Sequence, residues 1–169
     1  MTSPEKPTPP DAVDGIVAAW RRERPDLDVS PLQILSRVSR LARQLDLARG
    51  NAFGEFGLET WEFDVLSALR RAGAPYQLSP GNLLAATLVT SGTMTNRIDR
   101  LQKRGLVRRL PSPSDRRGVL VELTPAGADA VDGALSALLE HERTILDHLD
   151  AGQQEQLADY LRSVQVGLD

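Results

Sequence analysis

Apolar residues recur at helical spacing along almost the whole chain and change to strand spacing in one stretch, Leu106 to Leu123. A helix presents the same face about every 3.6 residues and a strand about every two, so this change separates the two kinds of element. Turn chemistry interrupts the stretch at Pro111-Ser112-Pro113-Ser114-Asp115, which predicts a β-hairpin with strands over 106–110 and 119–123. The fold class that follows is mainly α with a small β-hairpin.

Caps and helix breakers divide the helical part into segments. Four prolines in the first ten residues predict a disordered tail over 1–10. Amphipathic spacing predicts a short helix over 11–25. Ser30-Pro31 predicts the start of a longer helix over 30–50, followed by a glycine-containing loop over 51–58. Further helix starts are predicted at Thr60, Ser79, Thr124 and Asp150.

Two short helices come immediately before the hairpin, and we expect a tight connection between them at Val89-Thr90-Ser91-Gly92. The second of them places Met94, Ile98 and Leu101 on one face, which we expect to be buried, and ends at Gly105. A pair of helices joined by a short turn and followed by a basic hairpin is the order of a winged helix-turn-helix. The hairpin is then the wing.

Positive charge is concentrated in the same part of the chain. Residues 94–117 contain eight basic and two acidic residues, whereas residues 118–169 contain two basic and ten acidic ones, although the whole chain has a net charge of only −3. A cationic block of this kind favours a polyanion site such as double-stranded DNA. A helical protein-interaction domain whose arginines are simply solvated is the alternative.

The exposed side chains of the second helix suit contact with DNA. Arg97 can donate two hydrogen bonds to a guanine, and Asn96 can pair in the same way with an adenine. Free N–H groups at a helix start favour phosphate, and three hydroxyl side chains lie there: Ser91, Thr93 and Thr95. Arg100 lies about one helical turn after Arg97.

The predicted wing tip carries two arginines, Arg116 and Arg117, which suit a narrow minor groove. Asp115 stands two residues before Arg117 and is placed to orient its guanidinium group. We therefore expect the tip to contact DNA beside the groove that the second helix enters.

Other classes of site are excluded by composition. The chain has no cysteine, which excludes disulfides, thiolate metal sites and cysteine nucleophiles. Its two histidines, His141 and His148, are seven residues apart, which does not match a helical metal-binding pair. With no glycine-rich phosphate loop, no nucleophile elbow and no apolar run near 18 residues, we expect no enzyme, cofactor, metal or membrane span, but a soluble cytoplasmic protein.

Five short motifs, in this order along the chain, resemble the MarR family over roughly residues 30–165. They are Phe63-Asp64-Val65-Leu66, Thr95-Asn96-Arg97-Ile98-Asp99-Arg100-Leu101, Arg104-Gly105-Leu106-Val107-Arg108, Asp115-Arg116-Arg117-Gly118 and Leu123-Thr124-Pro125-Ala126-Gly127. The resemblance implies a domain over 30–166 that forms a homodimer, with a winged helix-turn-helix core over 60–124 and dimerisation helices over 30–50 and 125–166. It further implies a ligand-responsive repressor that binds a pseudo-palindromic operator with half-sites about one helical turn apart.

The resemblance also implies which residues touch DNA. Ser91, Thr93, Asn96 and Arg97 match contact positions on the recognition helix, and Asp115 and Arg117 match an Asp-x-Arg motif in the wing. Two departures affect the wing: Arg116 is an additional charge, and Gly118 stands where many members carry a second acidic residue.

The helix expected over 11–25 and the residues after it are similar to a urate- and phenolic-responsive subgroup with an extra N-terminal helix. There the resemblance implies a site for a small aromatic or phenolic anion, urate being one possibility, formed by Trp20, Asp64, Arg71 and Arg100. An arginine would pair with the anion and the indole would stack on it. The alternatives are that Trp20 only packs and that Asp64 and Arg71 form an ordinary salt bridge.

Overall fold

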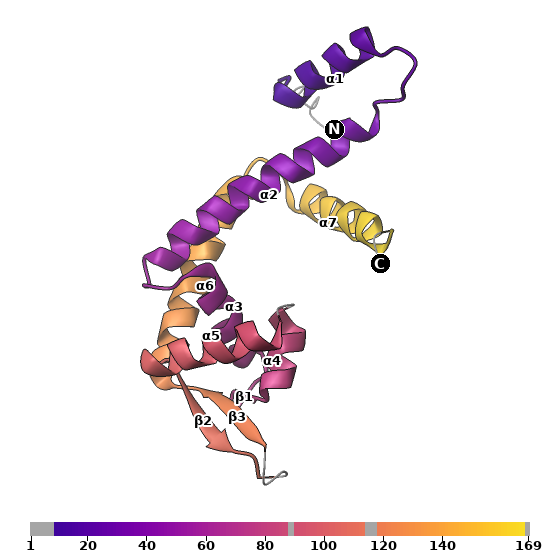
Figure 1. The fold of residues 1–169 in the computed structure, drawn as a ribbon. Coiled ribbons are helices and arrows are strands. Elements are labelled where there is room, and N and C mark those ends of the chain that lie inside the picture. The colour runs from indigo at the N-terminus through magenta and orange to yellow at the C-terminus, as the bar shows by residue number, and fades with distance from the viewer. Residues whose placement is uncertain (1–8, 88–89, 114–117, 168–169) are drawn as a thin grey trace. The chain divides into compact units, whose positions relative to one another are not determined.

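The computed structural model describes residues 9–87, 90–113 and 118–167. Within them the chain forms seven helices and one three-stranded antiparallel sheet, so the predicted fold class is confirmed (Figure 1). The chain divides into two compact units, residues 1–47 and 48–169, and the boundary falls within α2 (Pro31–Gly54).

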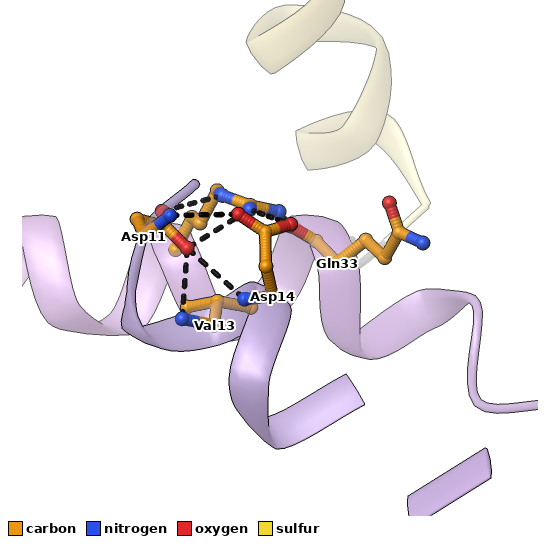
Figure 2. A network of polar contacts seen from close by, with 5 residues as sticks. Asp11, Val13, Asp14 and Gln33 are labelled. Carbon is orange, nitrogen blue, oxygen red and sulfur yellow. Dashed lines mark hydrogen bonds and ion pairs between the residues drawn. The ribbon is translucent and has the colours of Figure 1, made fainter. Parts of the chain in front are cut away.

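The first unit contains α1 (Ala12–Glu23) and the beginning of α2, around a small core of Val13, Val17 and Val29. A polar network fixes the start of α1 (Figure 2). The Asp11 carboxylate caps α1 by accepting a hydrogen bond from the backbone N–H of Val13 at 2.8 Å, and Arg37 Nε donates to the same carboxylate at 2.8 Å. Arg37 Nη2 also donates to Asp14 at 2.8 Å, so one guanidinium joins α2 to both carboxylates of the capping box.

The Arg37 hydrogen bond lowers the pKa of Asp11 to about 2. A carboxyl group whose pKa is lower in the folded chain stabilises the fold above its ordinary pKa, and this contribution disappears as the pH falls through the folded value. The cap of α1 is therefore fully charged at neutral pH.

The second unit contains the sheet and the remaining helices. They are α3 (Thr60–Arg71), α4 (Pro80–Thr87), α5 (Ser91–Lys103), α6 (Pro125–Leu146) and α7 (Ala151–Val166). One continuous core joins the end of α2, α3, α4, α5, the sheet and α6 as far as Leu138. Its largest fully buried apolar side chains are Phe53, Leu66, Leu69, Leu83, Met94, Ile98, Leu101, Val65, Val107 and Val121.

The sheet has the strand order β1-β3-β2. The predicted hairpin is present as β2 (Val107–Pro111) and β3 (Val119–Leu123), with Arg109 opposite Val121. A third strand, β1 (Gln77–Leu78), pairs with the other edge of β3 and was not predicted. Two residues are too few to show a strand period, so the sequence pattern carries no signal for it.

The end of α2 differs from the sequence prediction. The helix continues past Gly50 to Gly54, so the first half of the loop predicted over 51–58 is helical. Ala52 and Phe53 are 8% and 1% exposed, which gives the additional turn a place in the core. This burial outweighs the low helix propensity of the glycine.

Two helix starts also differ from the prediction. The residue that precedes α3 and acts as its N-cap is Glu59, and Thr60 is already helical. Similarly, α5 begins at Ser91 after an N-cap at Thr90, so Ser91 and Gly92 belong to the helix and not to the connection before it. The three residues predicted to form the buried face of α5 are at most 1% exposed: Met94, Ile98 and Leu101.

The beginning of α6 packs against the sheet at a position that only glycine allows. A Cβ atom at Gly127 would lie 2.1 Å from the carbonyl oxygen of Leu106 and 2.8 Å from Leu123 Cδ1. Gly127→Ala should therefore lower the free energy of unfolding by about 1–3 kcal/mol, as overpacking typically does. Urea denaturation followed by circular dichroism measures the change.

Gly92→Ala is the matched control, because a Cβ at this helical glycine meets nothing within 4 Å. It should change the free energy of unfolding by less than about 1 kcal/mol. Equal stability of Gly127→Ala and the wild type would contradict the close contact of Gly127 with Leu106 and Leu123.

Candidate DNA-binding site

The exposed face of α5 is the centre of the candidate site. Burial of Met94, Ile98 and Leu101 fixes one face of this helix in the core, and the opposite side therefore faces solvent. Thr93 and Asn96 are exposed there. The face thus presents the hydroxyl and amide groups that the sequence assigned to DNA.

The start of α3 forms a cleft with this face. The cleft has a volume of about 550 Å³ and is lined by Glu59, Trp61, Gly92, Thr93, Asn96, Arg97 and Arg100. Four of the predicted DNA-contact residues, Thr93, Asn96, Arg97 and Arg100, therefore lie together. Glu59 and Trp61 were missed by sequence reasoning, because a tryptophan near the start of an amphipathic helix resembles any other packing residue.

Charged and aromatic side chains contact one another in this cleft. The guanidinium carbons of Arg97 and Arg100 lie 5.4 Å and 4.6 Å from the centre of the Trp61 ring. Glu59 accepts a hydrogen bond from Trp61 Nε1 at 2.7 Å and another from Arg100 Nη2 at 2.7 Å. The Trp61 hydrogen bond and then that of Arg100 lower the pKa of Glu59, which keeps its carboxylate ionised. We call these four residues the Trp61 cluster.

A buried carboxylate holds the end of α5. Glu62 on α3 is 1% exposed and forms an ion pair with Arg104, the C-cap residue of α5. Arg104 Nη2 also donates to the carbonyl of Gly57 at 2.8 Å, and Glu62 accepts the backbone N–H of Glu59 at 3.0 Å. The pair therefore joins the end of α5 to the start of α3 and to the loop before it.

Several of the basic residues in 94–117 form ion pairs with carboxylates of the same domain. Arg109 on β2 lies 2.6 Å from Asp99 on α5, and Arg108 pairs with Glu122 across the two strands of the hairpin. With Arg104 and Arg100, which pair with Glu62 and Glu59, four of the eight basic residues counted in the sequence thus have carboxylate partners within the described residues. The cationic surface is consequently smaller than the count suggested, and α5 carries the arginines of the cleft.

The remaining predicted DNA contacts are placed as follows. Ser91 is the first residue of α5, and Thr93 Oγ1 lies 2.9 Å from Thr90 Oγ1 at the helix start. Thr95 is exposed on α5. The wing-tip residues Asp115, Arg116 and Arg117 lie outside the described residues.

Asp64 on α3 is the predicted ligand residue with the most distinctive environment. Desolvation raises the pKa of its carboxyl group, against the attraction of three arginines, Arg97, Arg49 and Arg71. Its side chain is nevertheless open to solvent on one side.

The other three residues of the predicted ligand site are placed differently. Arg71 Nε donates to the backbone carbonyl of Ser67 at 3.2 Å, one turn earlier on α3. Arg100 belongs to the Trp61 cluster, with Glu59 as its partner. Trp20 lies on α1 in the first unit and is 49% exposed, so about half of its surface is open to solvent.

Comparison with known proteins fits these observations. The sequence pattern of the MarR family matches residues 56–118. The HTH-type transcriptional regulator PecS from Dickeya dadantii is 38% identical over 153 residues, which cover 90% of this chain and 92% of PecS.

The chain is a member of the MarR family.

Solved structures of the MarR family match as well. A mutant MarR from E. coli complexed with operator DNA superimposes with a TM-score of 0.67 and 28% identity, over 82% of this chain and 99% of that one. BpsR from Bordetella bronchiseptica, whose structure concerns regulation of its DNA binding by 6-hydroxynicotinic acid, gives a TM-score of 0.65 and 25% identity, over 78% and 92% of the two chains.

Membership in the MarR family makes this chain a DNA-binding transcriptional regulator with a winged helix-turn-helix, and not an enzyme. Within the described ranges, no helix has the length and apolar character that a bilayer span requires. The same ranges contain no group of three or more histidine, aspartate or glutamate side chains that could hold a metal ion.

The buried Glu62 makes the stability of the domain sensitive to Arg104. Arg104→Met would leave the buried carboxylate without its cation, and we expect a loss of about 1–3 kcal/mol in the free energy of unfolding, because the Arg104 side chain is itself 41% exposed. Thermal or urea unfolding measures this loss. Arg22→Met removes the exposed pair of Arg22 with Glu23 and serves as the control. The proposed role of the buried pair would be wrong if both variants were equally stable.

Proposed function

We propose that this regulator is a cytoplasmic repressor that binds a pseudo-palindromic operator as a homodimer and responds to a small aromatic anion. The observation that carries the proposal is the exposed face of α5, where Asn96, Arg97 and Arg100 line one cleft with Thr93. Amide and guanidinium groups on the free face of a helix are the chemistry that reads base edges in the major groove.

In this proposal α5 is the recognition helix. Arg97 and Asn96 read bases, and Arg100 contacts DNA beside them. The start of the helix binds phosphate through its N–H groups and the hydroxyls of Ser91, Thr93 and Thr95. The wing tip, Asp115 to Arg117, enters the flanking minor groove. The likeness of the domain to a MarR structure that contains operator DNA supports this arrangement.

The proposed dimer would cover apolar surface that a single chain leaves open. In α7 none of the residues is buried, and in the described residues of α2 and α6 apolar side chains also face solvent. The residues concerned are Ile34, Leu35, Val38 and Leu41 on α2, Leu135, Leu139, Ile145 and Leu146 on α6, and Leu157, Tyr160, Leu161 and Val164 on α7. Exposed apolar surface of this extent marks an interface with another chain.

The roles that we propose for the segments of the chain follow from this exposed apolar surface. Residues 30–50 and 125–166 dimerise, and the core over 60–124 binds DNA. The helix over 11–25 is an addition to this MarR-type domain over 30–166, preceded by the tail over 1–10. A dimer of this kind presents two recognition helices, and their spacing sets the distance between the operator half-sites.

DNA binding is tested with a duplex that the wild-type protein selects from a random-sequence pool. Arg97→Ala should lower the preference for this duplex over random DNA by about tenfold or more, since a bidentate arginine–guanine pair contributes about 1–3 kcal/mol of discrimination. Arg117→Ala should weaken binding to both DNAs by a similar factor. Fluorescence anisotropy titrations at several salt concentrations measure both effects.

Wild-type affinity should fall as salt rises, because phosphate neutralisation releases counterions. Affinity that does not change with salt would contradict DNA binding of this kind. If Arg97→Ala lost the same affinity for the selected duplex and for random DNA, Arg97 would not be a base-reading residue.

We further propose that an effector anion binds at Asp64 and Arg71, and the subgroup resemblance adds Trp20 and Arg100 to this site. The electrostatic attraction between the Asp64 carboxyl group and Arg97, Arg49 and Arg71 supports it, because an anion would repel Asp64 and compete for these arginines. One of those arginines, Arg97, belongs to the recognition helix, so anion binding would alter the DNA-reading face directly. The similarity to BpsR, whose structure concerns regulation of its DNA binding by 6-hydroxynicotinic acid, is consistent with such a response.

The response is tested by adding urate, and separately 6-hydroxynicotinate, to the protein–DNA complex. The effective anion should raise the dissociation constant for the selected DNA by about 5- to 150-fold, the usual range of coupling between two sites. Asp64→Asn and Trp20→Ala should reduce this shift, whereas Asp129→Asn, a change at an exposed carboxylate on α6, should preserve it. If neither anion shifted binding, the aromatic-anion proposal would fail while the DNA-binding proposal would stand.

A further inference from the structure

Trp61 has a place in the cleft that none of the proposed contacts uses. It stands in the first turn of α3, is half-buried, and packs against the core. The guanidinium carbons of Arg97 and Arg100 lie over its ring, at 5.4 Å and 4.6 Å from the ring centre. Both arginines come from α5, so one indole from α3 contacts two cations of the neighbouring helix.

Glu59 makes this arrangement electrostatically possible. Two guanidinium groups beside one ring repel each other, and a carboxylate next to them offsets the repulsion. Glu59 accepts from Arg100 Nη2 at 2.7 Å and from Trp61 Nε1 at 2.7 Å. Because one carboxylate holds both groups, the indole cannot turn over without losing its hydrogen bond. The ring is therefore fixed in the orientation that places its face under the arginines.

We propose that Trp61, oriented by Glu59, is a specificity-determining platform that holds Arg97 in position for base reading and Arg100 in position beside it, an inference that rests on the proposed function of α5. An arginine that is already fixed loses less conformational entropy when it donates two hydrogen bonds to a guanine. The same fixed guanidinium swings less easily to a phosphate when the base is wrong. Trp61 thus increases discrimination between DNA sequences more than it increases affinity for DNA as such.

A purely structural role of Trp61 predicts a different result, and α3 offers a matched control. Phe63 is also a half-buried aromatic residue of this helix, and it stacks on Phe53 with ring centres 4.0 Å apart. Phe63→Leu and Trp61→Leu both remove aromatic packing from α3. Only Trp61→Leu removes the ring that contacts Arg97 and Arg100.

The experiment measures the ratio of affinities for the selected duplex and for random DNA, together with the unfolding temperature of each variant. Trp61→Leu should lower this ratio by about tenfold, because two cation–π contacts are lost. Trp61→Phe keeps an aromatic face but has no N–H for Glu59, so it should give a smaller loss, and it replaces Trp61→Leu if that variant does not fold. Phe63→Leu should lower the unfolding temperature and leave the ratio within about twofold of the wild type.

Three results would count against the platform. The ratio could stay at the wild-type value in both Trp61→Leu and Trp61→Phe, or it could fall equally in Phe63→Leu. In either case the wild type would still prefer the selected duplex, so the proposed function would survive. A wild type that selects no sequence from the pool would overturn the proposed function, and the platform with it.

Discussion

The placement of α5 depends on one buried charge. A carboxylate without a partner is costly in the interior, so Glu62, at 1% exposure, requires the guanidinium of Arg104. The buried apolar face of α5 fixes which side of the helix meets the core, and the ion pair with its hydrogen bonds adds a directional contact at the end of the helix. Arg104 also binds the Gly57 carbonyl, so three segments meet at the end of α5. This contact sets the register in which the helix presents its outer face.

The rest of the second unit divides between a complete core and surface that a single chain leaves open. On α6 the residues up to Leu138 include members of the core, whereas Leu139, Ile145 and Leu146 are exposed. In α7 no residue is buried. In this member of the MarR family, α3, α4, α5 and the sheet therefore share one core, whereas α7 and the end of α6 leave apolar side chains exposed.

The features that the sequence predicted best are those with an apolar pattern repeated over several turns or with residues that restrict the backbone. The helical stripe of Met94, Ile98 and Leu101 and the alternation along β3 led to the correct elements and the correct buried face. The order of short motifs identified the family. Helix ends were less predictable: α2 continues past Gly50 because Phe53 has a place in the core, and that information is tertiary.

The candidate site was predictable in part for the same reason. Asn96, Arg97 and Arg100 follow from the free face of a helix whose buried face is known. Trp61 and Glu59 come from a different helix, more than thirty residues earlier, and only the packing of α3 against α5 brings them to the same cleft. The pairing of Arg104, Arg108 and Arg109 with Glu62, Glu122 and Asp99 was also hidden, because counting charges along the chain does not show which ones meet.

That pairing has a consequence for how the protein approaches DNA. Four arginines of the basic block are paired with carboxylates of the domain, and residues 118–169 contain ten acidic residues against two basic ones. Within the second unit, positive charge therefore lies on α5 and negative charge predominates along α6 and α7. The negative charge repels a duplex and the arginines of α5 attract it, and both effects act within about 8 Å at physiological ionic strength. Collisions in the wrong orientation separate quickly, and the protein samples DNA mainly with its reading face turned toward it.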